Sequence, residues 1–317
     1  MSGNGDTIVV GASNYGAGTG AVYVFQRTSA ASWAESARLN APAGANAGAF
    51  GNSVAISDDG TKILAGAPAG GTTTQGGAAY YVLISGTWTL KTVVAGGSAS
   101  ALGGQSVALS ADGTRAAVGA PQYKAAGSST VSGRVYSYTA TTTGLTTLAS
   151  IVDPSTATTV SSGPGFGGGA LSFTADNNGL LAAAPYAATA AGATSVGGMA
   201  YYYRYSTSWT RSATFSLTNT TNARLGYSGA ISPDGNRIIL GAPYYAATAG
   251  GREFISEKSG STWGVLTTIG PLGNNSTSSR VGISSAFGTN SRLVIGGNMQ
   301  KNSDGIVTGL AYLVDIS

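Results

Sequence analysis

The chain contains no cysteine and no histidine among its 317 residues. Disulfide bonds are therefore excluded, and packing must supply the stability of the fold. Structural zinc sites built from thiolate and imidazole ligands are excluded for the same reason. Thiol nucleophiles and imidazole general bases are absent too, which removes two of the commonest catalytic groups.

Charge is also scarce. The chain has 16 Lys and Arg against 12 Asp and Glu, a formal net charge of +4. The basic residues form no cluster, so we expect no nucleic-acid partner. With 42% hydrophobic residues, the composition is typical of a packed globular protein and not of a disordered one.

Long apolar runs are missing as well. No stretch approaches the ~20 apolar residues that a membrane-spanning helix needs, so membrane insertion is not expected. Residues 1–6 lack the basic and apolar regions of a secretory signal. Low charge and abundant small polar residues nevertheless suit an exposed surface. We therefore expect an extracellular location or one on a virion surface, which requires no secretory signal.

A repeated segment fills most of the chain. One short apolar run, bounded by turn residues, has six copies, which lie at 8–12, 63–67, 116–120, 180–184, 238–242 and 293–297. Such runs are typical of strands buried on both faces. Tight hairpins precede most of them, as the Asp-Gly and Asn-Gly pairs at 59–60, 112–113, 178–179 and 234–235 indicate.

Three further strands complete the repeat. A second set of six carries an aromatic residue that we expect to pack between sheets, namely Tyr23, Tyr80, Tyr136, Tyr201, Phe254 and Tyr312. A strand before the hairpin has five copies, marked by Phe50-Gly51 and its equivalents at 103–104, 166–167, 225–226 and 281–282. A last strand also has five copies, at 33–39, 88–94, 145–151, 209–216 and 263–269.

These repeats predict an all-β fold. We expect a six-bladed β-propeller of four-stranded antiparallel blades, since about 50 residues per repeat suits a blade. The first blade lacks its first strand and the last lacks its fourth. The alternatives are seven blades, or closure with a strand from a partner. A single domain spans 1–317, with repeats of approximately 6–48, 49–100, 101–162, 163–221, 222–278 and 279–317.

The pairing of Phe50-Gly51 with Gly66-Ala67-Pro68 resembles the FG-GAP repeat of integrin α-chain propellers. The segments 103–121, 166–185 and 225–243 keep this pattern with substitutions. The resemblance implies a propeller used for adhesion, ligand binding or assembly, usually without catalysis. Related propellers often hold calcium in carboxylate-rich loops, but most turns here supply one carboxylate each. We therefore favour hydrogen-bonded Asx turns and no cofactor, with calcium as the minority alternative.

The loops that follow the Gly-Ala-Pro segments are the candidate binding surface. They vary most in length, and binding residues concentrate on such loops over a rigid scaffold. Their tyrosine and amide side chains suit a protein or a carbohydrate, and the candidate residues are Tyr15, Gln122, Tyr123, Tyr186, Tyr244 and Tyr245. The same rings are equally suited to capping the blade edges.

Charged residues offer two weaker hypotheses. Lys62, Arg115, Arg237 and Arg292 follow the hairpin turns at one repeat position, as an anion-binding rim or, as we favour, as locally paired surface charges. Glu253 and Glu257 share one strand face, where we expect both to be exposed. A glycosidase needs two carboxylates about 5–10 Å apart in one pocket. No such pair is evident, so no enzyme and no metal site are expected.

The expected function is a non-catalytic structural or interaction propeller in an extracellular or virion-surface assembly. The alternative is a ligand-binding adhesin or lectin that uses the tyrosine-bearing loops. A protein partner or self-assembly suits the first function, and a carbohydrate suits the second.

Overall fold

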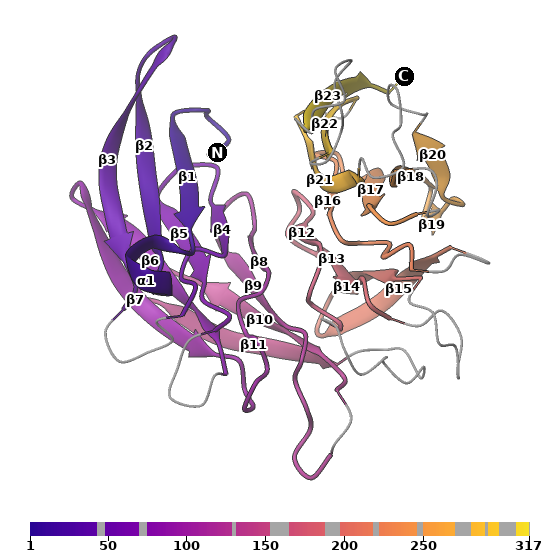
Figure 1. Cartoon of the computed structure of the whole chain (residues 1–317), viewed down its shortest axis with the longest axis horizontal. Helices are drawn as coiled ribbons and strands as arrows, with labels where there is room; N and C mark the ends of the chain where they lie inside the picture. Colours follow the sequence, from indigo (N-terminus) through magenta and orange to yellow (C-terminus); the bar gives the residue numbers. More distant parts are fainter. Residues whose placement is uncertain are drawn as a thin grey trace. The chain divides into compact units, whose positions relative to one another are not determined.

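Antiparallel β-sheets make up nearly all of the regular structure in the computed structural model (Figure 1). The one helical segment among the described residues, α1 (Tyr15–Gly18), is a single distorted turn in which Gly16 and Ala17 are left-handed. The structure describes residues 1–42, 48–69, 75–128, 131–152, 165–187, 197–217, 222–245, 250–269, 280–288, 291–297 and 309–316.

The chain divides into two compact units, Met1–Asp153 and Pro154–Ser317. The first unit holds three sheets, in the orders β1-β2-β3, β4-β5-β6-β7 and β8-β9-β10-β11. Their strands are β1 (Thr7–Ala12), β2 (Ala21–Ser29), β3 (Ser32–Asn40), β4 (Ser53–Ile56), β5 (Lys62–Gly66), β6 (Gly77–Ile84), β7 (Thr87–Ala95), β8 (Val107–Leu109), β9 (Arg115–Ala120), β10 (Arg134–Ala140) and β11 (Leu145–Val152).

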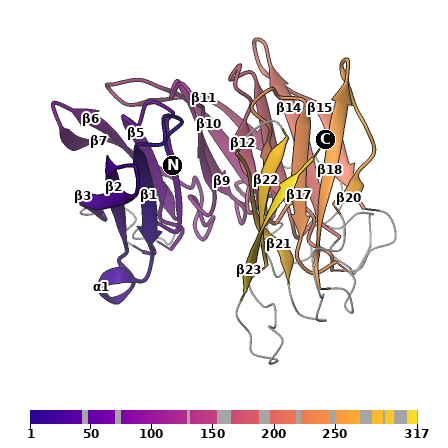
Figure 2. The ribbon, with the colours of Figure 1, turned by 90° about the horizontal axis from the view of Figure 1, so that it is seen from above.

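The second unit also holds three sheets. Their orders are β12-β13-β14-β15, β16-β17-β18-β19 with β20 also paired to β18, and β21-β22-β23 (Figure 2). The strands are β12 (Leu171–Phe173), β13 (Gly179–Ala184), β14 (Met199–Tyr205), β15 (Trp209–Ser216), β16 (Gly229–Ile231), β17 (Arg237–Ala242), β18 (Arg252–Ser259), β19 (Thr262–Trp263), β20 (Thr267–Ile269), β21 (Val281–Phe287), β22 (Arg292–Gly297) and β23 (Leu310–Asp315).

Each sheet is one blade of the repeat. Every described pairing within a blade joins strands that follow each other as an antiparallel meander, apart from β20, which replaces β19 along β18. The first and last blades have three strands, as the repeat pattern predicts. The all-β, six-bladed prediction is therefore confirmed, whereas the single-domain organisation stays a prediction.

The glycines of the repeat lie where two blades approach each other. A Cβ atom on Gly66 of β5 would lie 2.0 Å from the carbonyl oxygen of Gly104, which precedes β8 of the next blade. Gly11 and Gly51 make the same approach one blade earlier, with a gap too short for any side chain. The Phe-Gly segment of one blade thus packs on the Gly-Ala-Pro segment of the blade before it, and a side chain at Gly11 or Gly66 would clash with this contact.

Apolar side chains fill the spaces between neighbouring blades within a unit. Val22 and Leu39 of the first blade pack with Phe50, Ile63 and Tyr81 of the second, and all five are buried. The next interface contains Leu64 and Tyr80 of the second blade with Val118 and Tyr138 of the third. The two faces of a blade therefore serve different interfaces, which explains why its central strands are apolar throughout.

One predicted equivalence is wrong by a residue. The glycine that opens β6 at positive φ is Gly76, not Gly77, because it contacts Gly103 as Gly20 contacts Phe50. Ala79 is then the equivalent of Tyr23, and Tyr80 lies one position further along. Because strand side chains alternate between faces, Tyr80 points to the opposite face of its blade from the one expected of an equivalent of Tyr23. It packs between the second and third blades. A second glycine in the Gly76-Gly77 pair hid this shift in the sequence.

No helix in the described part of the chain is long and apolar enough to cross a membrane.

Candidate functional site

The tyrosines of the loops after the Gly-Ala-Pro segments each meet an arginine. Tyr15 shows the simplest case. Its hydroxyl accepts a hydrogen bond from Arg38 Nη1 at 2.8 Å, and the guanidinium carbon of Arg38 lies 5.2 Å from the ring centroid. The ring also packs edge-on against Tyr23 at 6.1 Å. Tyr15 is 44% exposed, so this pair is available to a partner.

Tyr123 is a packing residue instead. It is buried, and the guanidinium carbon of Arg134 lies only 3.7 Å from its ring centroid. Its neighbour Gln122 donates its backbone N–H to the carbonyl of Ala101, which holds this loop against the segment that leads into Gly103-Gly104 of the same blade. Cation–π stacking of this kind stabilises the end of the blade without requiring a ligand.

Two of the predicted residues, Tyr186 and Tyr244, come together around one arginine. The guanidinium carbon of Arg224 lies 4.5 Å from the Tyr186 ring centroid and 4.0 Å from that of Tyr244. Arg224 Nη1 also donates a hydrogen bond to the Tyr186 hydroxyl at 3.1 Å. A second arginine, Arg280, lies 5.1 Å from the Tyr244 ring, which Tyr227 contacts edge-on at 6.5 Å.

Tyr245 does not join this group although it follows Tyr244 directly. Its ring packs edge-on against Phe254 at 5.3 Å, with Arg252 5.5 Å from its centroid. The arginines were missed by the sequence reasoning. A signal was present for two of them, because Arg224 and Arg280 both stand immediately before the Leu-Gly or Val-Gly pair of their repeats.

The hairpin turns at the other end of the blades share one hydrogen-bonded design. In the second blade, Asp59 Oδ1 accepts bonds from the Ser57 hydroxyl and from the backbone N–H of Thr61 at 2.9 Å. The Lys62 N–H donates to Ser57 Oγ at 3.1 Å. Partial burial acts to raise the pKa of Asp59, but these hydrogen bonds outweigh it and hold that pKa below its ordinary value.

The same pattern of hydrogen bonds recurs in four more turns. It appears in the turns that begin at Ser2, Ser110, Thr174 and Ser232. The favoured Asx-turn interpretation fits these bonds, in which Oδ1 of the Asp or Asn accepts from its own turn. The first copy, in which Asn4 replaces the aspartate, was missed, although Ser2-Gly3-Asn4-Gly5 matches the spacing of Ser57-Asp58-Asp59-Gly60.

The basic residues that follow these turns are paired locally. Lys62 Nζ donates to the carbonyl of Gly113 in the next blade at 3.0 Å. Arg237 Nε bonds Glu257 at 2.8 Å, and Arg292 Nε bonds Asp315 at 2.7 Å. The ion pairs of Arg237 and Arg292 match the favoured interpretation of paired surface charges, whereas the contact of Lys62 is to a backbone carbonyl.

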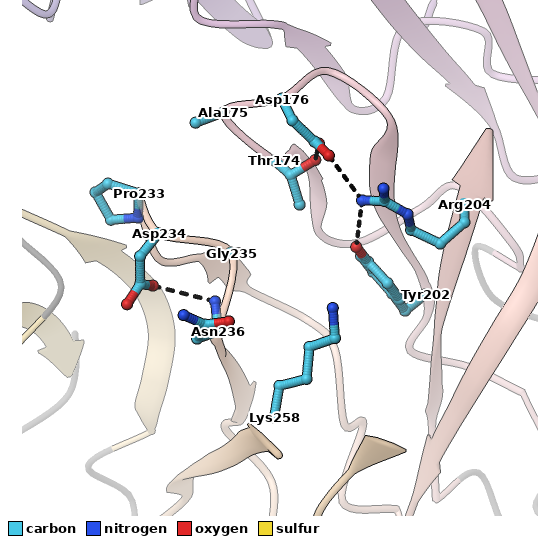
Figure 3. Close-up of a pocket in the computed structure, with 10 residues that line it drawn as sticks. All are labelled: Thr174, Ala175, Asp176, Tyr202, Arg204, Pro233, Asp234, Gly235, Asn236 and Lys258. Atoms are coloured by element: carbon cyan, nitrogen blue, oxygen red, sulfur yellow. Dashed lines mark hydrogen bonds and ion pairs between the residues drawn. The ribbon is translucent and has the colours of Figure 1, made fainter. Parts of the chain in front are cut away.

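A polar cavity of about 340 Å³ lies between the turns of the fourth and fifth blades (Figure 3). Gly179 occupies the repeat position of Lys62 there, so no side chain reaches across as Lys62 does. Arg204 Nη1 instead bridges Asp176 Oδ2 at 3.0 Å and the Tyr202 hydroxyl at 3.4 Å. Lys258 completes the wall. The cavity wall thus carries two acids, Asp176 and Asp234, and two bases, Arg204 and Lys258. Their charges balance, so the cavity favours neither anions nor cations.

Glu253 is a correction to the sequence-based expectation. It was expected to be exposed beside Glu257, but its exposed fraction is 0%. Neither carboxylate oxygen accepts a hydrogen bond of ordinary geometry within the described residues. Burial raises the pKa of Glu253 to about 8, against a small opposing effect of the nearby Ser285 hydroxyl. A carboxyl group in this setting is protonated at neutral pH.

No group of three or more acidic side chains gathers into a metal site within the parts of the chain that the structure describes. Glu253 and Glu257 also fail to act as a pair, because one is buried and the other forms a surface ion pair with Arg237.

Comparison with known families supports the repeat. Residues 33–83 match the family model described as the FG-GAP repeat. The match runs from the last strand of the first blade through β6 and includes Phe50-Gly51 and Gly66-Ala67-Pro68. No curated protein matches the chain. The predicted FG-GAP resemblance is thus confirmed, and this propeller fold is one that typically serves protein interaction and occurs in extracellular proteins.

Proposed function

We propose that this protein is a non-catalytic interaction propeller in an extracellular or virion-surface assembly. The observation that carries the proposal is an exposed apolar row on the last blade. Val294 of β22 and Leu313 of β23 are cross-strand partners and are 44% and 65% exposed. Ala286 of β21 extends the row on the other side of Val294. Val24 and Tyr80 occupy the repeat position of Leu313 and pack on the next blade of their unit. Within the second unit no described strand covers Val294 and Leu313, so this apolar row suits contact with another sheet or protein.

The disposition of the charged groups supports a non-catalytic role. The turn carboxylates are held by the turn hydrogen bonds, Glu257 and Asp315 by arginines, and Glu253 is buried alone. A general acid–base pair needs two titratable groups directed at one substrate. Asp176 and Asp234 line one cavity, but each accepts hydrogen bonds from its own turn.

Self-association tests the proposal. We expect the protein to form oligomers or particles, seen by size-exclusion chromatography with light scattering and by electron microscopy. Leu313→Asp should reduce this association, because it places a charge in the apolar row. Val265→Asp is the matched control, since Val265 is 85% exposed but lies outside the row. Equal assembly of both variants would contradict the role of this surface.

A second candidate function is ligand binding by an adhesin or lectin through the tyrosine-bearing loops. The observation that favours it is the convergence of Tyr186 and Tyr244 on Arg224. A glycan array tests it. We expect saturable binding that Tyr244→Ala abolishes and that the folded control Tyr15→Ala retains, because Tyr15 belongs to a different blade. An array without a binding glycan would count against this candidate.

A further inference from the structure

We propose that Arg224 and Arg280, with Tyr186 and Tyr244, form a binding site for the carboxylate or sulfate group of an acidic saccharide. The inference rests on the second candidate function above and specifies its ligand class. We call these four residues the Tyr–Arg cluster.

The cluster alternates rings and cations. Arg224 contacts both tyrosine rings, and Arg280 contacts the ring of Tyr244. Stacking fixes the direction of each planar guanidinium group while leaving its N–H groups free to bind at their edges. Only Nη1 of Arg224 has a hydrogen-bond partner among those observed, the Tyr186 hydroxyl, and Nε of Arg224 is buried without one. The cluster therefore holds spare donors in a fixed arrangement.

Two positive charges share this cluster, and the described residues supply no acid to neutralise them. Those acids of the second unit that the structure describes lie in the hairpin turns, in surface ion pairs or, for Glu253, in the core. Like charges that share one ring repel each other, and a bound anion would remove that repulsion.

The repeat does not require these arginines. The residue before the Phe-Gly type pair is left-handed in several blades, with φ of 57° at Ala49, 53° at Leu102, 57° at Arg224 and 46° at Arg280. The unusual backbone thus belongs to the propeller scaffold, since Ala49 and Leu102 adopt it without any charge. The cations at the last two copies are therefore not required by this backbone conformation.

The chemistry favours a saccharide over a peptide. A guanidinium fork matches the planar oxygens of a carboxylate, and sulfate oxygens accept the same donors. None of the large apolar side chains exposed in the described structure belongs to the cluster or to the strands beside it. An acidic peptide would usually need such apolar contacts for its own side chains.

Calorimetric titration tests the site with three probes: an oligogalacturonate, a sulfated oligosaccharide and a neutral oligosaccharide of equal length. We expect either acidic probe to bind more tightly than the neutral one, and the better acidic probe identifies carboxylate or sulfate as the preferred group. Binding should weaken as salt concentration rises, because it depends on charge.

Arg280→Ala should weaken binding of the acidic probe about tenfold or more, the loss expected from one charge-assisted contact. This variant should fold, because Ala49 has the same left-handed backbone in the second blade. Arg38→Ala is the matched control, since it also removes an arginine stacked on a tyrosine, and it should bind like the wild type. Thermal unfolding of both variants confirms that they are folded.

Several results would overturn the inference. An unchanged affinity of folded Arg280→Ala would do so, as would tighter binding of an acidic peptide than of either acidic saccharide. Binding of the neutral probe that depends on Tyr244 but not on Arg280 would reject the acidic ligand and leave the loop-binding function standing. Failure of every saccharide to bind would reject both.

Discussion

Glu253 on β18 lies directly across from Gly241 on β17, at a position where every other blade has alanine or valine. The equivalent cross-strand pairs place Val22 opposite Gly11, Ala78 opposite Gly66, Val135 opposite Gly119, Ala200 opposite Ala183 and Ala311 opposite Gly296. One apolar core position of the repeat is thus occupied by a carboxyl group.

The pH dependence of stability should reveal this carboxyl group. Burial raises the pKa of Glu253 from 4.5 to about 8 in the folded state. The folded protein therefore binds this proton more tightly than the unfolded chain does. As pH rises from 4.5 to 8, the free energy of unfolding should fall by at most about 1.4 kcal/mol per pH unit. Urea denaturation across this range measures the slope. Glu253→Gln, which cannot ionise, should remove it, and an unchanged slope in that variant would assign the effect to other groups.

Restoring the apolar residue should stabilise the protein at alkaline pH. Glu253→Val reproduces Val22 and Val135 and removes a buried polar group that lacks good hydrogen bonds. We expect a higher melting temperature than wild type at pH 8.5 and a smaller difference at pH 4. A variant that melts below wild type at pH 8.5 would show that Glu253 has a favourable partner.

The turn carboxylates should contribute more to the free energy of unfolding than exposed acids do. Asp59→Ala removes the acceptor for the Ser57 hydroxyl and the Thr61 N–H and should cost about 1–2 kcal/mol of unfolding free energy. The contribution should be present above pH 3.8 and disappear as pH falls through the lowered folded pKa of Asp59. Asp58→Ala is the control, because the Asp58 carboxylate accepts no observed hydrogen bond. Equal losses in the two variants would contradict this interpretation of the turn.

Gly66, at the interface between the second and third blades, should tolerate no side chain. In Gly66→Ala the added Cβ would meet the Gly104 carbonyl oxygen at 2.0 Å, so the blades must separate or the variant must fail to fold. In the control Gly288→Ala, the nearest atom would be the Arg292 carbonyl oxygen at 3.8 Å, an ordinary contact. Circular dichroism and soluble yield distinguish the two. A stable Gly66→Ala protein would show that the blade interface is looser than described.

The repeat made the fold predictable from the sequence. Strand identity followed from apolar runs and turn residues, because every blade repeats the same local physics. The register of β6 was less predictable, since Gly76 and Gly77 both satisfied the pattern and only the contact with Gly103 separates them.

The candidate site was less accessible to sequence reasoning. The tyrosines were found from their loops, but the pairing of Tyr186 with Tyr244 through Arg224 depends on segments 38 and 20 residues from one another in sequence and on a shared backbone geometry. The burial of Glu253 was hidden for a similar reason. A charged residue in an alternating strand is normally exposed, and only its alignment with Val22 and Ala200 indicates a core position.

We propose that this propeller works through contacts with other molecules and that the exposed row of Val294 and Leu313 is its assembly surface. Sedimentation velocity of the wild-type protein over a wide concentration range tests this most directly. We expect the wild-type protein to form larger species whose fraction grows with concentration. The Leu313→Asp variant should lack them. A wild-type protein that sediments as a monomer at every concentration would contradict it.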